Sequence, residues 1–323
     1  MTQAIRIHST GGPEVMQWDE VPTPEPGANE ALIKHEAVGL NYIDVYFRSG
    51  LYKAPHMPLT IGMEGAGTVV SIGAAVTNVK PGDRVAYAGP IGGYATFRTI
   101  AADRLVSLPA EISFATAAAM MLQGMTVQYL LRRTHPVVAG ETILLHAAAG
   151  GIGLIMCQWA KFLGVNVIGV VSTQAKADLA LANGAAHCVI GHADLPAQVK
   201  HITSGAMVPV VYDSVGRDTF TASLDCLAPL GLMVSFGNAS GPVPPVDLAM
   251  LGAKGSLFLT RPSLATYTAK QADLQHCAAE LMEVVANGAV KIQINQTFAL
   301  KDAAKAHIAL EARQTTGSTV LIP

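Results

Sequence analysis

The stretch LLHAAAGGIGL, residues 144–154, joins an apolar run to a cluster of small residues. Ala148, Gly150 and Gly153 occupy the frame G/A-x-G-x-x-G, in which the second position lets the backbone approach a pyrophosphate and the third lets a helix pack on a strand. A strand is predicted over residues 142–146 and a helix from Gly151. In this setting the turn predicts a dinucleotide site, with the pyrophosphate at the helix N-terminus, where N–H groups and the helix dipole favour an anion. The alternative is a tight strand-to-helix turn that binds no ligand.

The sequence around this turn alternates between short apolar strands and helices, from residue 142 to about residue 260. Strands that are apolar throughout and connected by helices are typical of a parallel sheet covered on both faces. We therefore predict an α/β fold with a doubly wound Rossmann sheet. Just before it, residues 113–134 (SFATAAAMMLQGMTVQYLLRRT) have helical spacing, with Ser113 as the expected N-cap.

The two ends of the chain have a different pattern. The first hundred residues contain strand-like segments between Gly/Pro turns, such as EGAGTVVSIG and NVKPGDRVAYAG, and predict a separate β-rich domain. After Arg261 the sequence predicts an amphipathic helix that ends at Gly288, then the strands INQTFAL and STVLIP. This tail is too short to be a domain, so we expect it to rejoin the N-terminal β domain.

Composition excludes several classes of protein. The 323 residues are 50% hydrophobic and 14% charged, with a formal net charge of −2, which is sufficient for two globular domains and provides no basic patch for nucleic acid. No apolar run reaches the roughly 18 residues that span a bilayer, and the N-terminus lacks the pattern of a signal peptide. We therefore expect a cytoplasmic protein with no membrane or nucleic-acid partner. Four widely separated cysteines are expected to be small buried hydrophobes: Cys157, Cys188, Cys226 and Cys277.

The end of the second predicted strand indicates which dinucleotide binds. An NAD site usually carries Asp or Glu about 20 residues after the glycine turn, to hold the ribose 2′-OH. Here the strand ends in Ser172, Thr173 and Gln174, followed by Lys176, with no acid among them. Hydroxyls and a cation suit a 2′-phosphate, so the sequence favours NADPH. As an alternative, Lys176 is an ordinary solvated helix residue.

Longer motifs carry a family resemblance over the whole chain, in order. They are VGLNYIDVYFRSGLY, IGMEGAGTV, VKPGDRVAY, HAAAGGIGLIMCQWAKFLG, VVYDSVGRDTF, GLMVSFGNASGPV, GSLFLTRPSL and GSTVLIP. The chain resembles the medium-chain dehydrogenase/reductase superfamily, and within it the zinc-independent NADPH:quinone oxidoreductases that include ζ-crystallin. The resemblance implies a GroES-like catalytic domain from residues 1–122 and 264–323 and a Rossmann domain from residues 123–263.

Two positions distinguish this chain from the zinc alcohol dehydrogenases of the same superfamily. Asn41 stands where those enzymes have a cysteine ligand, and Met63 stands where they have the histidine of a G-H-E motif. A thioether does not suit Zn²⁺, which needs three or four good N, S or O ligands. We therefore expect no metal.

The resemblance also implies the cofactor contacts. Near the nicotinamide it places Asn41, Tyr42, Ile43 and Tyr46. At the pyrophosphate it places Gly150, Gly151, Ile152 and Gly153, and at the 2′-phosphate Ser172 and Lys176. The further contacts are Ser214, Phe236, Gly237, Asn238, Phe258, Leu259, Thr260 and Arg313. Where relatives have a tyrosine near the adenine this chain has His192, which either binds a phosphate or is an exposed loop residue.

These features lead to a functional hypothesis, hydride transfer from NADPH to a quinone. Tyr46 or Tyr52 would line the acceptor pocket and donate a hydrogen bond to the developing oxyanion, and Asn41 would do the same or hold the nicotinamide ribose. Tyr52 is equally well explained as a surface packing residue. Two alternatives stay open: reduction of the C=C bond of an enone, 2-alkenal or enoyl thioester, and a non-catalytic NADPH-binding structural or RNA-binding protein. The sequence does not determine the acceptor or the number of electrons transferred per encounter.

The last apolar strand of the Rossmann region, SLFLT at residues 256–260, is expected at the edge of the sheet. An unpaired edge invites symmetric strand pairing. We therefore expect a homodimer with a continuous sheet.

Overall fold

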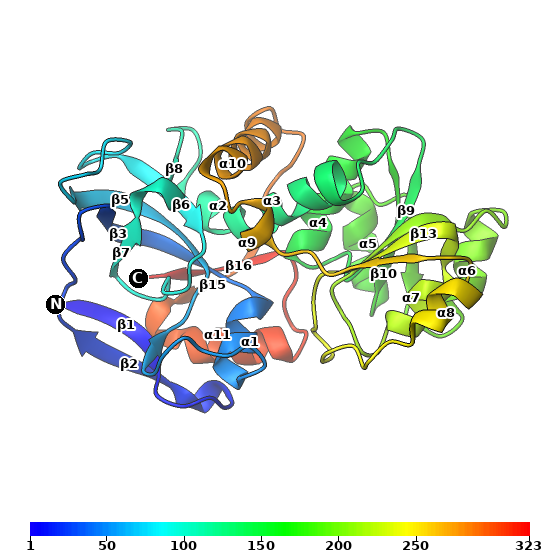
Figure 1. Ribbon diagram of the computed structural model, residues 1–323, viewed down its shortest axis with the longest axis horizontal. Helices are drawn as coiled ribbons and strands as arrows, with labels where there is room; N and C mark the ends of the chain where they lie inside the picture. The colour runs from blue at the N-terminus through cyan, green and yellow to red at the C-terminus, as the bar shows by residue number, and fades with distance from the viewer. The chain divides into compact units, whose positions relative to one another are not determined.

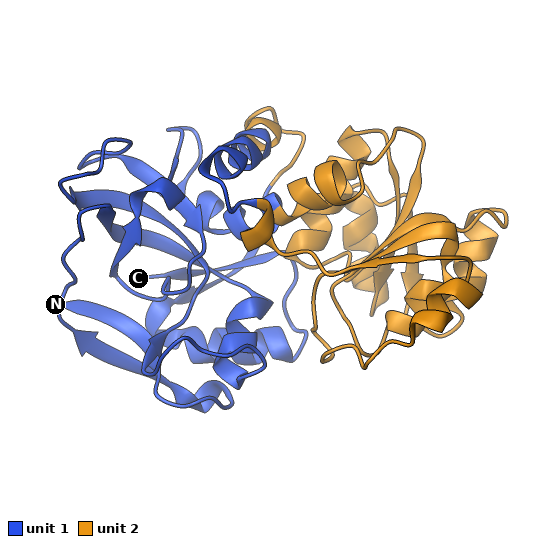
Figure 2. Cartoon of the chain, in the orientation of Figure 1, with its two compact units in different colours: residues 1–125, 268–282, 292–323 blue, residues 126–267, 283–291 orange.

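The computed structural model describes all residues, 1–323, and divides them into two compact units (Figure 2). The first unit contains residues 1–125, 268–282 and 292–323, and the second contains residues 126–267 and 283–291. The segment 283–291, expected in the β-rich domain, therefore belongs to the second unit. Gln158 explains this, because its side chain donates to Lys291 O (3.1 Å) and accepts from Lys291 N (2.8 Å). The functional domain boundaries at 122/123 and 263/264 stay a prediction.

The second unit is built on a six-stranded sheet of order β11-β10-β9-β12-β13-β14, in which every neighbouring pair is parallel (Figure 1). In chain order this is 3-2-1-4-5-6, the Rossmann arrangement, so that prediction is confirmed. The strands are β9 Thr142–His146, β10 Asn166–Val171, β11 His187–Ile190, β12 Val208–Asp213, β13 Leu227–Ser235 and β14 Phe258–Thr260. The helices are α4 Gly151–Phe162, α5 Gln174–Ala182, α6 Leu195–Ile202, α7 Phe220–Asp225, α8 Leu248–Ala253 and α9 Leu264–Tyr267.

The strands of this sheet are buried because they are apolar on both faces. Leu144 of β9, Ile168 of β10, Val211 of β12 and Met233 of β13 are all fully buried in one core cluster. Each such side chain contributes roughly 1.5–3 kcal/mol when it leaves water. β14 lies at the sheet's edge, as expected, paired only with β13 in this chain.

The first unit contains two sheets, one of order β2-β1-β4 and one of order β15-β16-β3-β5-β6-β8 with β7 also on β3. The strands are β1 Thr2–Ile7, β2 Met16–Val21, β3 Glu30–Leu40, β4 Leu59–Thr60, β5 Glu64–Ile72, β6 Arg84–Ala88, β7 Phe97–Ala101, β8 Val106–Ser107, β15 Ile294–Ala299 and β16 Ser318–Ile322. The helices here are α1 Tyr42–Ser49, α2 Phe114–Ala118, α10 Gln271–Ala286, which continues into the second unit, and α11 Ala303–Glu311. Short 3-10 turns lie at Pro13–Val15, Ala102–Arg104 and Leu300–Asp302.

Strand pairing confirms two predictions for this unit. β16 pairs antiparallel with β3, with Val320 opposite Gly39, so the C-terminal tail rejoins the β domain. β5 and β6 pair antiparallel across the Gly/Pro turn, with Gly65 opposite Tyr87. No helix of the structure is both long enough and apolar enough to cross a membrane.

The helical segment predicted over residues 113–134 is confirmed, but the structure divides it into more than one element. Ser113 is its N-cap, as predicted, and accepts from Thr116 N at 3.0 Å. The segment then divides into α2, α3 (Met121–Tyr129) and a π-helical turn, Leu130–Thr134. At the break, the Ala119 carbonyl accepts the Ser318 hydroxyl at 3.0 Å. No Gly or Pro lies at the break, where Ala119 makes this tertiary contact.

The cysteine prediction is confirmed at three of four positions. Cys157, Cys226 and Cys277 are free and buried, and burial raises the pKa of the Cys157 thiol to about 12. Cys188 on β11 is only half-buried.

Three buried histidines are forced to stay neutral. His35 bonds the Ala95 carbonyl (2.6 Å) and the Tyr87 hydroxyl (2.7 Å), and burial lowers its pKa from 6.5 to about 3. Burial likewise lowers the pKa of His146 to about 4 and that of His307, beside Arg48, to about 3. A lowered histidine pKa stabilises the fold above pH 6.5, and that contribution is lost as the pH falls below 6.5 toward the folded-state value.

Replacing His35 tests whether its lowered pKa makes the stability of the fold depend on pH. Glutamine can bond both the Ala95 carbonyl and the Tyr87 hydroxyl but does not titrate. We expect the stability advantage of wild type over His35→Gln to shrink by about 2 kcal/mol between pH ~6.5 and pH ~5. Urea unfolding of both proteins across this range measures it. His276→Gln, at an exposed histidine, should leave the pH dependence unchanged; equal slopes for wild type and His35→Gln would contradict the assignment.

Candidate active site

The glycine turn has the geometry that a pyrophosphate site requires. β9 ends at His146, and α4 begins at Gly151 with Gly150 as its N-cap. A Cβ on Gly153 would lie 2.4 Å from the Ala147 oxygen and 2.5 Å from the Ala148 carbonyl carbon, so only glycine lets the helix pack this closely. No side chain caps α4, which leaves the N–H groups of its first turn directed out of the helix.

The other predicted cofactor contacts in the second unit follow the carboxyl ends of the strands. Ser172 follows β10 and is exposed, and Lys176 lies in the first turn of α5, whose N-cap Thr173 accepts from Lys176 N at 3.3 Å. Ser214 follows β12, Phe236 to Asn238 follow β13, and Thr260 ends β14. Because the strands are parallel, these segments share the edge of the sheet that carries the glycine turn.

Two of these segments are in direct contact. Phe236 N donates to Asp213 O at 2.8 Å, and a Cβ on Gly237 would lie 2.3 Å from Ser214 O. The structure therefore brings Ser214 and Gly237 together.

Phe258 and Leu259 of β14 are exposed, at 60% and 37%.

Sequence reasoning missed the residues that hold these loops. Asp213 is fully buried and its carboxylate accepts from Val215 N, Gly216 N, Thr219 Oγ1 and Ser223 Oγ at 2.7–3.0 Å. Asp213 is the acid of the motif YDSVGRDTF that ends the buried strand β12, and an acid at the end of an apolar strand was the signal available in the sequence.

Arg261 was missed in the same way. Its Nη1 donates to Ser235 O (2.8 Å) and Gly237 O (3.2 Å). The Asn238 amide, oriented so that Oδ1 accepts from Arg261 Nη2 (3.0 Å), donates to Gly237 O (2.9 Å). Arg261 thus holds the loop of Phe236, Gly237 and Asn238.

His192 lies in the exposed loop after β11, with its ring centroid 5.7 Å from that of His146. His146 is buried, and its Nε2 lies 2.9 Å from Ser223 Oγ. His192 is thus an exposed loop residue next to the glycine turn's strand, and a phosphate contact there stays a prediction.

In the first unit, α1 carries the residues predicted at the nicotinamide. Asn41 is its N-cap and forms a capping box with Asp44. Tyr42 and Tyr46, one helical turn apart, lie with ring centroids 6.1 Å apart, and Tyr52 packs 5.2 Å from Tyr46. Tyr46 is buried and Tyr52 half-buried, so the structure brings these aromatic residues into one cluster beside Asn41 and Ile43.

The Asn41 side chain is held by two other buried residues. Its Nδ2 donates to Glu64 Oε1 at 2.5 Å, and its Oδ1 accepts from Gln123 Nε2 at 3.0 Å. Burial raises the pKa of Glu64 to about 8, although hydrogen bonds from Asn41 and Leu122 N lower it. Burial also raises the pKa of Asp44 to about 7. Sequence reasoning missed Glu64 and Gln123, although Glu64 directly follows the Met63 that it did identify.

Arg313 lies in the same part of the first unit as Tyr42. Arg48 of α1 is buried and makes two 2.8 Å bonds to Glu311 of α11, and Tyr42 Oη donates to Leu310 O at 3.4 Å. Arg313 follows α11, and its charge opposes the rise that burial causes in the Tyr42 pKa. The packing of α1 on α11 therefore brings Arg313 near the predicted nicotinamide residues.

The positions that would hold zinc carry unsuitable donors. Asn41 offers a carboxamide that Glu64 and Gln123 already bind, and Met63 offers a thioether. No three His, Cys, Asp or Glu side chains are grouped so as to hold a metal ion. The residues present therefore do not fit a zinc site.

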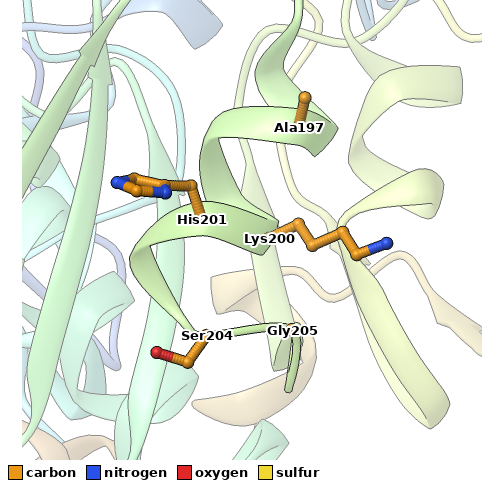
Figure 3. Close-up of a pocket in the computed structure, with 5 residues that line it drawn as sticks. All are labelled: Ala197, Lys200, His201, Ser204 and Gly205. Carbon is orange, nitrogen blue, oxygen red and sulfur yellow. The ribbon is translucent and has the colours of Figure 1, made fainter.

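A separate surface hollow lies at the C-terminal end of α6, lined by Ala197, Lys200, His201, Ser204 and Gly205 (Figure 3). All five residues are exposed, and Lys200 and His201 point to opposite sides of the helix. None of them belongs to the predicted site.

Comparison with known proteins identifies both domains. Residues 27–110 match the alcohol dehydrogenase GroES-like domain, and residues 151–283 match the zinc-binding dehydrogenase domain. A quinone oxidoreductase of Pseudomonas aeruginosa is 52% identical over 325 residues, covering all of both chains. The structure of Escherichia coli quinone oxidoreductase in complex with NADPH is 49% identical and superimposes with a TM-score of 0.98, again over all of both chains.

A third relative has a different named activity. The 2-haloacrylate reductase of a Burkholderia species is 40% identical over 334 residues, covering 100% of this chain and 99% of that protein. The fold and the full-length identities agree with the motifs, and the chain belongs to the ζ-crystallin-like quinone oxidoreductase family of the medium-chain dehydrogenases/reductases.

Proposed function

We propose that this protein is an NADPH-dependent quinone oxidoreductase that works without a metal. The observation that carries the proposal is the full-length likeness to a quinone oxidoreductase solved with NADPH, at 49% identity. The uncapped turn of α4 and the close packing at Gly153 independently support a dinucleotide at this position.

The residues after β10 fit NADPH better than NADH. Ser172 and Thr173 supply hydroxyls, Lys176 supplies a positive charge, and residues 172–176 contain no carboxylate to bind a free ribose 2′-OH. We propose that Ser172 and Lys176 bind the 2′-phosphate, that Gly150 to Gly153 bind the pyrophosphate, and that the other contacts implied by the resemblance, His192 and Arg313 included, complete the site.

When bound, the cofactor supplies a hydride from its reduced nicotinamide. The chain's own residues orient the acceptor and stabilise the charge that develops on it. Tyr46 and Tyr52 are packed against each other, and one of their hydroxyls is proposed to donate to the acceptor oxygen. Asn41, fixed by Glu64 and Gln123, is proposed as a second donor.

The 2-haloacrylate reductase relative supports a second candidate function, reduction of an activated C=C bond. It requires the same hydride donor together with proton delivery to the α-carbon, for which Tyr46 is the candidate. A non-catalytic NADPH-binding role is the third alternative. The cytoplasm remains the proposed location.

Steady-state oxidation of NADPH with quinones, 2-alkenals, enoyl thioesters and 2-haloacrylates as acceptors tests the function. We expect the highest kcat/KM with quinones, because they are strongly electrophilic and need little acid assistance. We expect Tyr46→Phe or Tyr52→Phe to lower kcat roughly 10-fold, by removing the donor to the oxyanion.

The same assay separates the alternatives. Turnover with haloacrylates or alkenals but not with quinones would establish C=C reduction instead, and no turnover with any acceptor would leave the non-catalytic role. Full kcat in both tyrosine variants would remove these hydroxyls from the mechanism.

Lys176→Ala tests the choice of cofactor. Loss of one charge-assisted contact to the 2′-phosphate should weaken NADPH binding about 10-fold and leave NADH binding unchanged. Calorimetric titration with both nucleotides measures this. Lys200→Ala, at an exposed lysine of α6, is the control and should change neither; an equal loss for both nucleotides would contradict a 2′-phosphate role.

We also propose a homodimer in which β14 of one copy pairs with β14 of another. The free edge of β14 and the exposed Phe258 support it. In sedimentation equilibrium at micromolar concentration we expect the mass of two chains for wild type and partial dissociation for Phe258→Asp, because a charge is placed at the apolar edge. A wild-type monomer under these conditions would refute the proposal.

A further inference from the structure

The hydrogen bonds of the Asn41 side chain leave it one unused N–H donor to offer a ligand. We infer that Glu64 and Gln123 are positioning residues that hold Asn41 as a hydrogen-bond donor, aimed at an acceptor oxygen of the bound ligand. The inference rests on the proposed function, because its kinetic test measures turnover of NADPH with a quinone. Glu64 and Gln123 are not among the cofactor contacts proposed above.

The amide of Asn41 has two N–H donors and one oxygen. One N–H is bound to Glu64 Oε1 (2.5 Å), and the oxygen accepts from Gln123 Nε2 (3.0 Å). The second Nδ2 proton has no partner in the protein, although the residue is only 7% exposed. A nearly buried donor without a partner is costly, and a ligand oxygen would satisfy it.

Glu64 determines the direction of the amide. Both of its oxygens accept N–H groups, one from Asn41 and one from Leu122 N at 2.7 Å. If the Asn41 amide were turned over, its nitrogen would face Gln123 Nε2, donor against donor, and its oxygen would face a Glu64 oxygen that carries no proton when Glu64 is ionised. Asn41 must therefore present nitrogen to Glu64 and keep its other N–H in a fixed direction.

Gln123 holds the opposite side of the amide. Its Nε2 faces Asn41, and its Oε1 accepts from Ser318 Oγ at 2.8 Å. The network thus joins Asn41 before α1, Glu64 of β5, Gln123 of α3 and Ser318 of β16. All four residues belong to the first unit. Gly39 makes room for it, because a Cβ there would lie 2.3 Å from Glu64 Oε1.

A double-mutant cycle tests whether Glu64 acts through Asn41. With NADPH and a quinone, we expect Asn41→Ala to lower kcat about 100-fold and Glu64→Gln about 10-fold, with little change in KM, because glutamine can accept from Asn41 or from Leu122 but not from both. The variant carrying both changes should be no slower than Asn41→Ala alone, because Glu64 then has nothing left to position. Losses that multiply in the double variant, or wild-type kcat in Glu64→Gln, would overturn the inference.

Tyr87→Phe is the matched control. Tyr87 is fully buried in the same unit and bonds His35 rather than Asn41. We expect this variant to lose stability with kcat unchanged. Ser318→Ala, a milder change at the far end of the network, should lower kcat about 2–5-fold while it retains the fold.

A second readout does not depend on turnover. In ¹H–¹⁵N spectra, the Asn41 side-chain amide, assigned by its absence in Asn41→Ala, should give two proton signals whose chemical shifts change in Glu64→Gln. NADPH or a quinone should shift the signal of the second proton. Inactivity of the wild type with all acceptors would refute the proposed function alone. Asn41 signals that are unchanged in Glu64→Gln, or that neither ligand shifts, would refute the positioning role.

Discussion

A carboxyl group that is buried must find hydrogen-bond partners, because leaving a polar group unpaired away from water costs roughly 1–3 kcal/mol, and more when it is ionised. Each unit of this protein arranges its functional loops around such a group. In the first unit Glu64 accepts from Asn41 and from the backbone of α3. In the second, Asp213 accepts from the two backbone N–H groups and two hydroxyls that follow β12. The predicted ligand contacts, Asn41 and Ser214, lie next to these two anchors.

These anchored hydrogen-bond donors suggest how a hydride transfer can be assisted in a chain whose residues do not bind zinc. In the zinc alcohol dehydrogenases a metal ion polarises the carbonyl group, whereas here the corresponding positions carry an amide and a thioether. Rigid neutral donors replace part of that polarisation when they are preorganised. Preorganisation comes from groups that do not react: Glu64 and Gln123 for Asn41, and Arg261 for the loop of Asn238.

Local patterns were sufficient for most of the fold. The strand order of the Rossmann sheet follows from apolar strands alternating with helices, and the return of the C-terminal strand to β3 follows from a tail too short to fold alone. The break between α2 and α3 could not be predicted, because no Gly or Pro marks it and the contact found there joins Ala119 to Ser318, residues far apart in sequence. The placement of 283–291 in the second unit depends in the same way on Gln158 and Lys291.

The sequence by itself was sufficient to predict those parts of the site that consist of residues close together in the chain. The spacing of Gly150 and Gly153 predicts a pyrophosphate turn, in which the close packing requires glycine at residue 153, and the absence of an acid from residues 172–176 predicts a 2′-phosphate contact. Only the tertiary structure decided which groups orient the others. Glu64, Gln123, Asp213 and Arg261 are ordinary polar residues in sequence. For Glu64, Gln123 and Asp213 this function arises because the fold removes them from water, so each must form its hydrogen bonds with the groups that the fold brings to it. Arg261 stays exposed and acts through its bonds to the carbonyls of Ser235 and Gly237.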